Sequence, residues 1–243
     1  MQKKYPVVSE MVTRLETAAG ESLLSVVVYG PAAHGDQLAN QKNTNLLVVL
    51  SDISLASISK VGGPVRWWLA KGEPLPRVFS PKFITDAADV FPMEFLDITA
   101  HHDVVYGTDP LLGLDVKKGH LRNQCERELR ETLMRIQEAY LEANGKQKEL
   151  LALLTGSYPV FASVFRGCLQ LGDHAVPARD ADVIREFCRH TSLDQGPFAE
   201  IGDLRNGVKI ASRPAVLFQN YYQQITLAIE ALDSFQTENG ETT

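Results

Sequence analysis

Two apolar runs near the N-terminus are bordered by polar residues that could take part in chemistry. The run Leu23 to Tyr29 is followed by Gly30 and Pro31, and the next run begins with Asn43 and Asn45. Residues two positions apart on a β-strand point to the same face of the sheet. Asn43 and Asn45 would therefore present two side-chain amides next to each other. Amide oxygens can bind a cation, but unlike carboxylates they bring no negative charge to it.

Three acidic residues are candidates to supply that charge. Asp36 lies in the polar loop between the two apolar runs, and Glu94 and Asp97 belong to a later apolar segment, residues 91–100. We expect this segment to be a β-strand. Because Glu94 and Asp97 are three positions apart, a regular strand would point them to opposite faces, and only one could reach the site. Glu94 is the preferred metal ligand and Asp97 the alternative.

The hydrophobic pattern of the first half predicts the elements that position these residues. Valine-rich runs bounded by turn residues predict buried strands, and apolar residues three to four positions apart predict helices. We expect strands over residues 23–29, 43–50, 74–80 and 91–100, and helices over residues 7–19 and 54–71, with a short helix or turn at 81–89. Gly62, Gly63 and Pro64 are expected to interrupt the second helix.

The second half of the chain has a helical period throughout. We expect helices over residues 121–143, 149–171, 180–190, 198–204 and 214–235, with a kink or break at Pro159. No segment after residue 117 has the pattern of a strand. The sequence therefore predicts an α+β fold with two domains, a mixed sheet with helices over residues 1–115 and an all-helical bundle over residues 116–243.

The motifs of the first half resemble those of the nucleotidyltransferase superfamily, which includes DNA polymerase β and kanamycin nucleotidyltransferase. In that family Gly-Ser follows the first strand, and Asp-x-Asp begins the second strand within SDxDLLVV. The matching residues here are Gly30-Pro31 and Asn43-Thr44-Asn45, and LLVV follows the second motif. The segments FPMEFLD and VVYGTDPL also resemble the family, and the resemblance covers residues 1–115.

The resemblance implies metal-dependent nucleotidyl transfer, and the residues that differ from the family pattern imply that this activity is lost. In the family the two aspartates and a third carboxylate from a later strand hold two Mg²⁺ ions, which clamp the triphosphate and activate the attacking hydroxyl. The turn holds phosphate oxygens through its N–H groups and its serine. Here Asn43 and Asn45 remove two negative charges, and Pro31 has neither an N–H nor a hydroxyl. These changes predict a pseudoenzyme, in which Gly30, Pro31 and Asp36 remain as nucleotide-binding positions.

Two functions follow from this interpretation. The leading one is a catalytically impaired homologue whose cleft, with the vestigial positions Asn43, Asn45 and Glu94, binds a nucleotide or a protein partner. The alternative is an active enzyme that transfers a nucleoside monophosphate to a hydroxyl of a small molecule or a protein. That enzyme would need Mg²⁺, held by Glu94, Asp97 or Asp36, and no other cofactor is expected.

Simpler interpretations of the same residues are open. Valine-rich strands with a glycine turn occur in unrelated α/β domains, and asparagine is common at turns. His101, His102 and Asp103 could form a metal or acid–base cluster, but adjacent side chains on a strand point apart, which favours a solvated strand end. One of Trp67 and Trp68 could stack on a base, although a core residue beside a partly exposed one is the simpler interpretation.

The composition narrows the range of partners and compartments. The chain has 24 basic and 30 acidic residues and a net charge of -6, which argues against broad nucleic-acid binding. Its three cysteines lie far apart, which predicts neither a disulfide framework nor a zinc site and fits a reducing cytoplasm. We expect no membrane span and no secretory signal. The candidate partners are a nucleotide, a protein, or a second copy of the chain bound through apolar helix faces.

Overall fold

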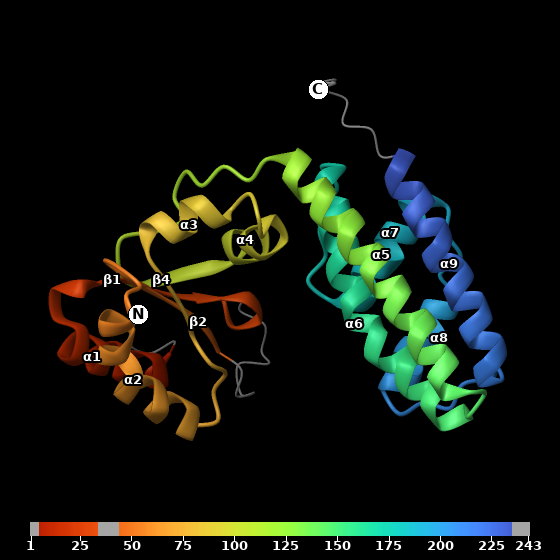
Figure 1. The fold of residues 1–243 in the computed structure, drawn as a ribbon, viewed down its shortest axis with the longest axis horizontal. Helices are drawn as coiled ribbons and strands as arrows, with labels where there is room; N and C mark the ends of the chain where they lie inside the picture. Colours follow the sequence, from red (N-terminus) through yellow and green to blue (C-terminus); the bar gives the residue numbers. More distant parts are fainter. Residues whose placement is uncertain (1–4, 34–43, 235–243) are drawn as a thin grey trace. The chain divides into compact units, whose positions relative to one another are not determined.

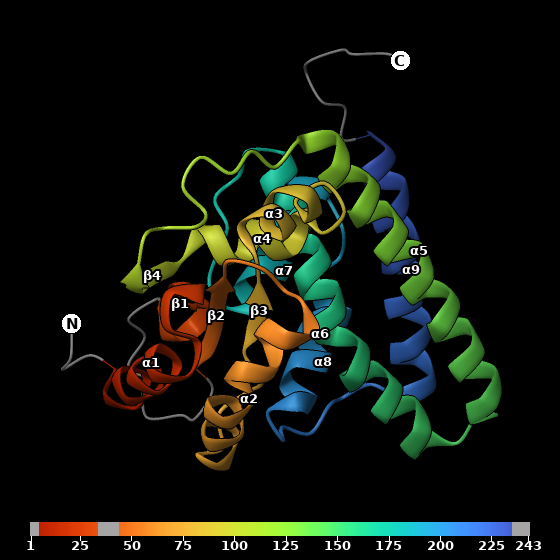
Figure 2. The same ribbon diagram turned by 60° about the vertical axis from the view of Figure 1, so that its left-hand side comes forward.

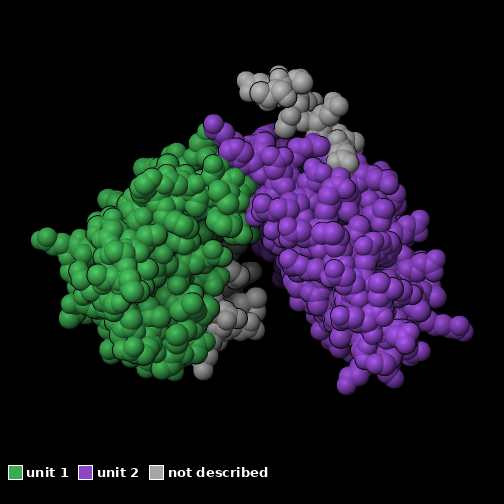
Figure 3. Space-filling model, viewed as in Figure 1, with its two compact units in different colours: residues 1–116 green, residues 117–243 purple. Residues whose placement is uncertain are grey.

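The structure is a computed structural model, and it describes residues 5–33 and 44–234. The chain divides into two compact units, residues 1–116 and residues 117–243 (Figure 3). The first unit contains a mixed sheet with helices and the second contains helices, so the fold is α+β, as predicted.

The sheet of the first unit has four strands in the order β3-β2-β1-β4. The strands are β1 Leu23–Tyr29, β2 Asn45–Leu50, β3 Arg77–Phe79 and β4 His102–Gly107. β1 pairs antiparallel with both β2 and β4, and β2 pairs parallel with β3. The two valine-rich runs are thus the central strands. Most of their side chains are apolar and buried, because helices cover both faces of the sheet.

Helices cover both faces of this sheet (Figures 1 and 2). α1 Pro6–Ala19 and α2 Leu55–Ala70 pack on one face, and α3 Pro81–Ala87 and α4 Pro92–Ala100 pack on the other. Side chains alternate along β1, so that Val26 and Val28 meet Met11 of α1, whereas Val27 meets Phe95 of α4. Tyr29 at the end of β1 and Asn45 at the start of β2 lie opposite each other at one end of this layered core.

Residues 91–100 form a helix, and the predicted strand is wrong. α4 begins with Pro92 at its first position, where the missing N–H costs no hydrogen bond. Glu94 lies in the first turn, where a negative charge is favourable near the helix N-terminus. Met93, Phe95 and Ile98 are buried. The strand of this region comes immediately afterwards, as β4.

The predicted interruption of α2 is also wrong. The helix runs without a break from Leu55 to Ala70, and Gly62, Gly63 and Pro64 lie inside it. Pro64 is buried with Val61 and Trp68 on the side that packs into the core. This burial outweighs the low helix propensity of the three residues. α6 likewise continues through Pro159.

The second unit is a helical bundle, as predicted. Its helices are α5 Lys118–Ala143, α6 Gln147–Leu171, α7 Asp180–Thr191, α8 Gly196–Arg205 and α9 Pro214–Ser234. Asn144 ends α5 in a left-handed conformation with φ 45°, as the Asn-Gly signal indicates. No strand occurs in the described part of this unit, residues 117–234.

α6 is the central helix of the bundle. It contacts α5, α7, α8 and α9, and it buries Phe161 and Phe165. The Phe165 ring stacks on Phe187 with centroids 4.0 Å apart, and the buried Tyr221 hydroxyl lies 3.0 Å from the Ser157 hydroxyl. Within residues 5–33 and 44–234, α6 is the one helix long and apolar enough to cross a membrane, and half of that apolar window is buried inside the protein. Its place in the core accounts for its composition.

Candidate functional site

In the turn after β1, the backbone N–H groups of Gly30 and Ala33 donate within the protein. Gly30–Ala32 form one turn of 3-10 helix, and Gly30 has a φ of 73°, in the left-handed region that favours glycine. The Gly30 N–H donates to the His101 carbonyl at 3.2 Å, and the Ala33 N–H donates to the Gly30 carbonyl at 3.0 Å. Pro31 has no N–H. The capacity of this turn to bind an anion is correspondingly small.

Asn45 lies directly beside this turn. It pairs with Tyr29 across the two central strands. A Cβ atom at Gly30 would lie 3.1 Å from the Asn45 Nδ2 atom, which is tighter than an ordinary contact. Gly30 is therefore required twice, once for its backbone angle and once for the space that the Asn45 amide occupies.

Three polar side chains form a row across neighbouring strands at this end of the sheet. Tyr29 of β1 pairs with Asn45 of β2 on one side and with His102 of β4 on the other. Residues directly opposite in antiparallel strands share a face, so these three side chains share the face that α3 and α4 cover. All three are half-buried. We call Asn45, Tyr29 and His102 the polar row.

His102 is held by acceptors at both ring nitrogens. Nδ1 lies 3.1 Å from the Thr99 carbonyl and Nε2 lies 3.1 Å from Oδ2 of Asp109. Both hydrogen bonds form together only when both ring nitrogens carry a proton. Burial raises the pKa of Asp109, but the Leu111 N–H and the His102 ring outweigh it and hold the pKa below its ordinary value. The two acceptors fix the orientation of the His102 ring, and the low pKa of Asp109 favours a carboxylate beside it.

Asp103 belongs to the opposite face of the sheet. It pairs with Val28, and Val28 also pairs with the buried Leu46. The Tyr5 hydroxyl donates to Oδ2 of Asp103 at 2.7 Å, and it also lies 3.0 Å from the Ala32 carbonyl. Asp103 thus ties the start of α1 to β4 and to the turn, and its carboxylate does not join the polar row.

The two predicted metal ligands lie on α4. Since residues 91–100 are helical, Glu94 and Asp97 are almost one turn apart, and the expectation that they point to opposite faces is wrong. Glu94 is half-buried and Asp97 is exposed. In the part of the chain that the structure describes, no three His, Cys, Asp or Glu side chains are grouped so that they could hold a metal ion. The predicted positions Asn43 and Asp36 lie outside the described residues.

Sequence reasoning missed two residues of this region. Asp109 precedes Pro110 and accepts the Leu111 N–H at 2.9 Å, an arrangement typical of aspartate at turns. The segment VVYGTDPL contains that signal, but nothing in it marks His102 as the partner. Tyr5 has no signal, because its contact with Asp103 joins residues that are far apart in the sequence.

Trp67 and Trp68 are a partly exposed residue beside a core residue, which is the simpler of the two interpretations of this pair. Trp68 is fully buried, and its Nε1 donates to the Pro74 carbonyl at 2.7 Å. Trp67 is half-buried, and the Arg14 guanidinium lies 4.4 Å from the centre of its ring. This cation–π contact occupies a face of the indole on the α1 side of the unit.

Comparisons with known proteins give a likeness among solved structures. No protein-family model and no curated protein matches the sequence. Among solved structures, the chain is similar to spectinomycin adenyltransferase AAD(9) from Enterococcus faecialis, determined with ATP and spectinomycin. The TM-score is 0.55 at 9% sequence identity, and the match covers 91% of this chain and 99% of that chain. This chain therefore has the same fold as a nucleotidyltransferase.

Proposed function

We propose that this protein is a catalytically impaired nucleotidyltransferase homologue that has kept its site as a binding surface for a nucleotide or a protein partner. One observation carries the proposal: the Asn45 amide lies against Gly30. By the motif resemblance, the second aspartate of Asp-x-Asp would occupy this position. A neutral amide at that point removes a negative charge where the metal ions of an active enzyme would have to bind.

The charge of the polar row supports this proposal. Two Mg²⁺ ions bring four positive charges, and carboxylates are the groups that usually balance them. The row offers an amide from Asn45, a phenol from Tyr29 and the ring of His102, whose partner Asp109 is already engaged. None of these groups adds uncompensated negative charge, so the attraction for a divalent cation is weak.

A nucleotide is the ligand that these groups favour. The Asn45 amide can donate hydrogen bonds to a phosphate oxygen, and the half-buried Tyr29 ring offers an apolar surface beside it. We expect binding to be weak, because the N–H groups of Gly30 and Ala33 donate within the protein. We also expect it to be independent of Mg²⁺.

The cytoplasm is the compartment that we propose for this function. Cys125, Cys168 and Cys188 are all free and buried. Burial raises the pKa of the Cys188 thiol to about 12. Three unreactive thiols in one chain are typical of proteins in a reducing environment.

Calorimetric titration of ATP into the full chain, with Mg²⁺ or with a chelator, tests the proposal. We expect the wild-type protein to bind ATP with a similar Kd in both conditions. The double variant Asn43→Asp with Asn45→Asp restores two carboxylates, so its affinity should rise at least about tenfold when Mg²⁺ is present.

The control for this titration is Asn144→Asp with Asn206→Asp, which adds the same two charges at exposed helix ends of the second unit. It should bind as the wild type does. A wild-type affinity that requires Mg²⁺ would argue for a working metal site. If the double variant binds ATP with Mg²⁺ no more tightly than the wild type does, the site does not lie at Asn43 and Asn45.

An active metal-dependent nucleotidyltransferase is the alternative function. The observation that favours it is the position of α4, which packs on the face of the sheet to which Asn45 belongs. Glu94 and Asp97 are on this helix. With Asp36 from the loop before β2, they are the carboxylates that could replace those of the Asp-x-Asp motif. An assay of metal-dependent nucleotidyl transfer by the full chain separates the two functions.

A further inference from the structure

The outer surface of α9 carries no charge over most of its length. Residues 214–229 contain no Asp, Glu, Lys, Arg or His. In the whole chain, Asp, Glu, Lys and Arg make up 22% of the residues. One side of this segment, including Leu217, Tyr221 and Ile225, is buried in the bundle. The other side is exposed, and its larger residues are Val216, Gln219, Asn220, Gln223 and Leu227. Solvent-facing helices normally carry charged residues, so an uncharged exposed side indicates contact with something other than water.

The neighbouring helix α5 extends this surface with apolar side chains. Met134, Tyr140 and Leu141 are exposed, and Leu141 is 76% exposed. Together with Val216 and Leu227 of α9 they form what we call the α5/α9 face. In the described part of the second unit, Val160 and Val208 are the other large hydrophobic residues that are exposed. Exposed apolar residues of this unit are thus gathered on one pair of helices, and such a patch marks an interaction site.

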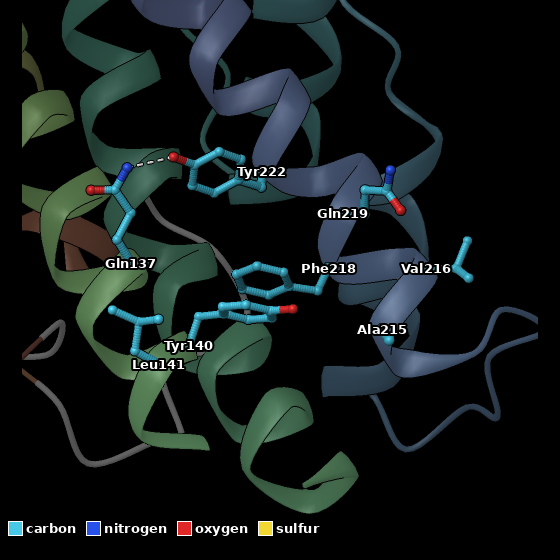
Figure 4. A pocket seen from close by; sticks show the side chains of 8 residues that line it. All are labelled: Gln137, Tyr140, Leu141, Ala215, Val216, Phe218, Gln219 and Tyr222. Carbon is cyan, nitrogen blue, oxygen red and sulfur yellow. Dashed lines mark hydrogen bonds between the residues drawn. The ribbon is translucent and has the colours of Figure 1, made fainter. Parts of the chain in front are cut away.

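A hollow lies between the two helices on this face. Its volume is about 640 Å³, and Gln137, Leu141, Val216 and Gln219 are among its lining residues (Figure 4). The Tyr140 and Phe218 rings stack between the helices with centroids 4.5 Å apart, and the Gln137 side chain donates to the Tyr222 hydroxyl at 2.5 Å. These contacts fix the shape of the hollow. Every residue that lines it is uncharged.

We propose that the α5/α9 face is where a second copy of this chain binds, in a two-fold symmetric dimer. In such an interface the same patch meets itself, so a charged residue near the axis would lie close to its own copy and repel it. The outer side of α9 is free of that repulsion along residues 214–229. The charges that give the chain its net charge of -6 all lie outside residues 214–229, so two copies that meet along this segment keep those charges away from the contact.

The size of the face fits a protein better than a small ligand. Met134 and Leu227 are exposed parts of it but do not line the hollow. Leu227 is about 16 Å along α9 from Val216, at about 1.5 Å per residue. A ligand in the hollow would leave both residues in water. The uncharged length of α9 is about 24 Å, and two helices side by side are about 20 Å wide, so two copies would bury about 1,000 Å² in total, near the lower limit for a specific interface.

Sedimentation equilibrium of the full chain tests this proposal. We expect the wild type to form dimers as its concentration rises through the micromolar range. Leu141→Glu and Val216→Glu would each place two like charges in the interface, so each should raise the dimer Kd at least about tenfold. The matched controls are Val160→Glu and Val208→Glu, which change residues of 37% and 51% exposure outside the face and should dimerise as the wild type does.

Three results would overturn the proposal. A wild-type chain that stays monomeric up to high-micromolar concentration has no dimer to explain. A dimer that survives both Leu141→Glu and Val216→Glu, with the helical circular dichroism unchanged, must use another surface. A monomer that binds the neutral aromatic probe N-phenyl-1-naphthylamine saturably, with loss of binding in Val216→Glu, would assign the hollow to a small ligand instead.

Discussion

Gly107 lies where a side chain would clash with the backbone of the neighbouring strand. It ends β4 with a φ of 75°, and it pairs with Ser25 of β1. A Cβ atom at this position would lie 1.9 Å from the Leu24 carbonyl oxygen, a distance that real atoms do not adopt. The backbone of β1 would have to move, and β1 is the strand at the centre of the sheet.

The variant Gly107→Ala should therefore lower the free energy of unfolding by ~2 kcal/mol or more, from the left-handed backbone and from the clash together. Urea denaturation measures this change. Gly63→Ala is the matched control, because Gly63 is exposed inside α2 and a Cβ there meets nothing within 4 Å. It should stabilise the helix by about 0.5–1 kcal/mol. Equal effects of the two substitutions would contradict this account of Gly107.

The places of two candidate residues could be predicted from the sequence. Gly30 directly follows β1 and Asn45 begins β2, and strands of this composition are recognisable without knowledge of their neighbours. Whether the two residues form a functional site stays a prediction. The partners of His102 and Asp103 could not be found in this way. Asp109 contacts His102 and Tyr5 contacts Asp103 only in the folded chain, and no local sequence pattern indicates these contacts.

At the scale of elements, the start of α2 shows how a few hydrogen bonds fix a helix. The Ser54 hydroxyl accepts the Ser57 N–H at 3.3 Å, as expected of a capping residue. Asp52 accepts the Ser54 N–H and the Ser57 hydroxyl, each at 2.9 Å. Hydrogen bonds from the hydroxyl and N–H of Ser54, followed by that from the Ser57 hydroxyl, lower the pKa of Asp52 from 3.8 to about 2.

This pKa shift predicts a pH-dependent contribution to stability. The folded chain holds the Asp52 proton less tightly than the unfolded chain does, so the contribution is complete above pH 3.8 and is lost as the pH falls towards about 2. Asp52→Asn should remove it, which makes the decline of unfolding free energy less steep in this window. Urea denaturation at several pH values measures the slope. Asp115→Asn, at an exposed aspartate of the same unit, should leave the slope as in the wild type, and equal slopes for all three proteins would contradict the prediction.

The elements that were predicted wrongly share a physical cause. Residues 91–95 alternate between apolar and other side chains in a way that fits both a strand and the start of a helix. The helix forms because Pro92 and Glu94 suit its first turn and because Phe95 and Ile98 reach the core from the same side. In α2, burial of Pro64 decides the outcome over local propensity. Tertiary packing determines the structure of both segments, and the sequence pattern of one segment gives no information on that packing.

At the scale of the whole molecule, the chain has the fold of a nucleotidyltransferase, and we propose that neutral groups stand at the motif positions. The likeness to spectinomycin adenyltransferase extends over 91% of the chain at 9% identity. Fold and chemistry are separable, because a fold positions a site and the side chains in the site decide what it does. The α+β fold could be predicted because strand and helix periods differ clearly between the two halves of the sequence. The fold alone does not decide whether the chain is active, so the activity must be measured.

The most direct measurement is nucleotidyl transfer by the purified full chain. The protein is incubated with Mg²⁺ or Mn²⁺, with ATP, CTP, GTP or UTP labelled at the α-phosphate, and with cell extract as the source of acceptors. Spectinomycin adenyltransferase with ATP and spectinomycin serves as the positive control. Our account predicts no metal-dependent transfer above that of extract alone. Transfer that requires both the metal and the protein, and that Glu94→Ala abolishes, would contradict it and assign the metal site to α4.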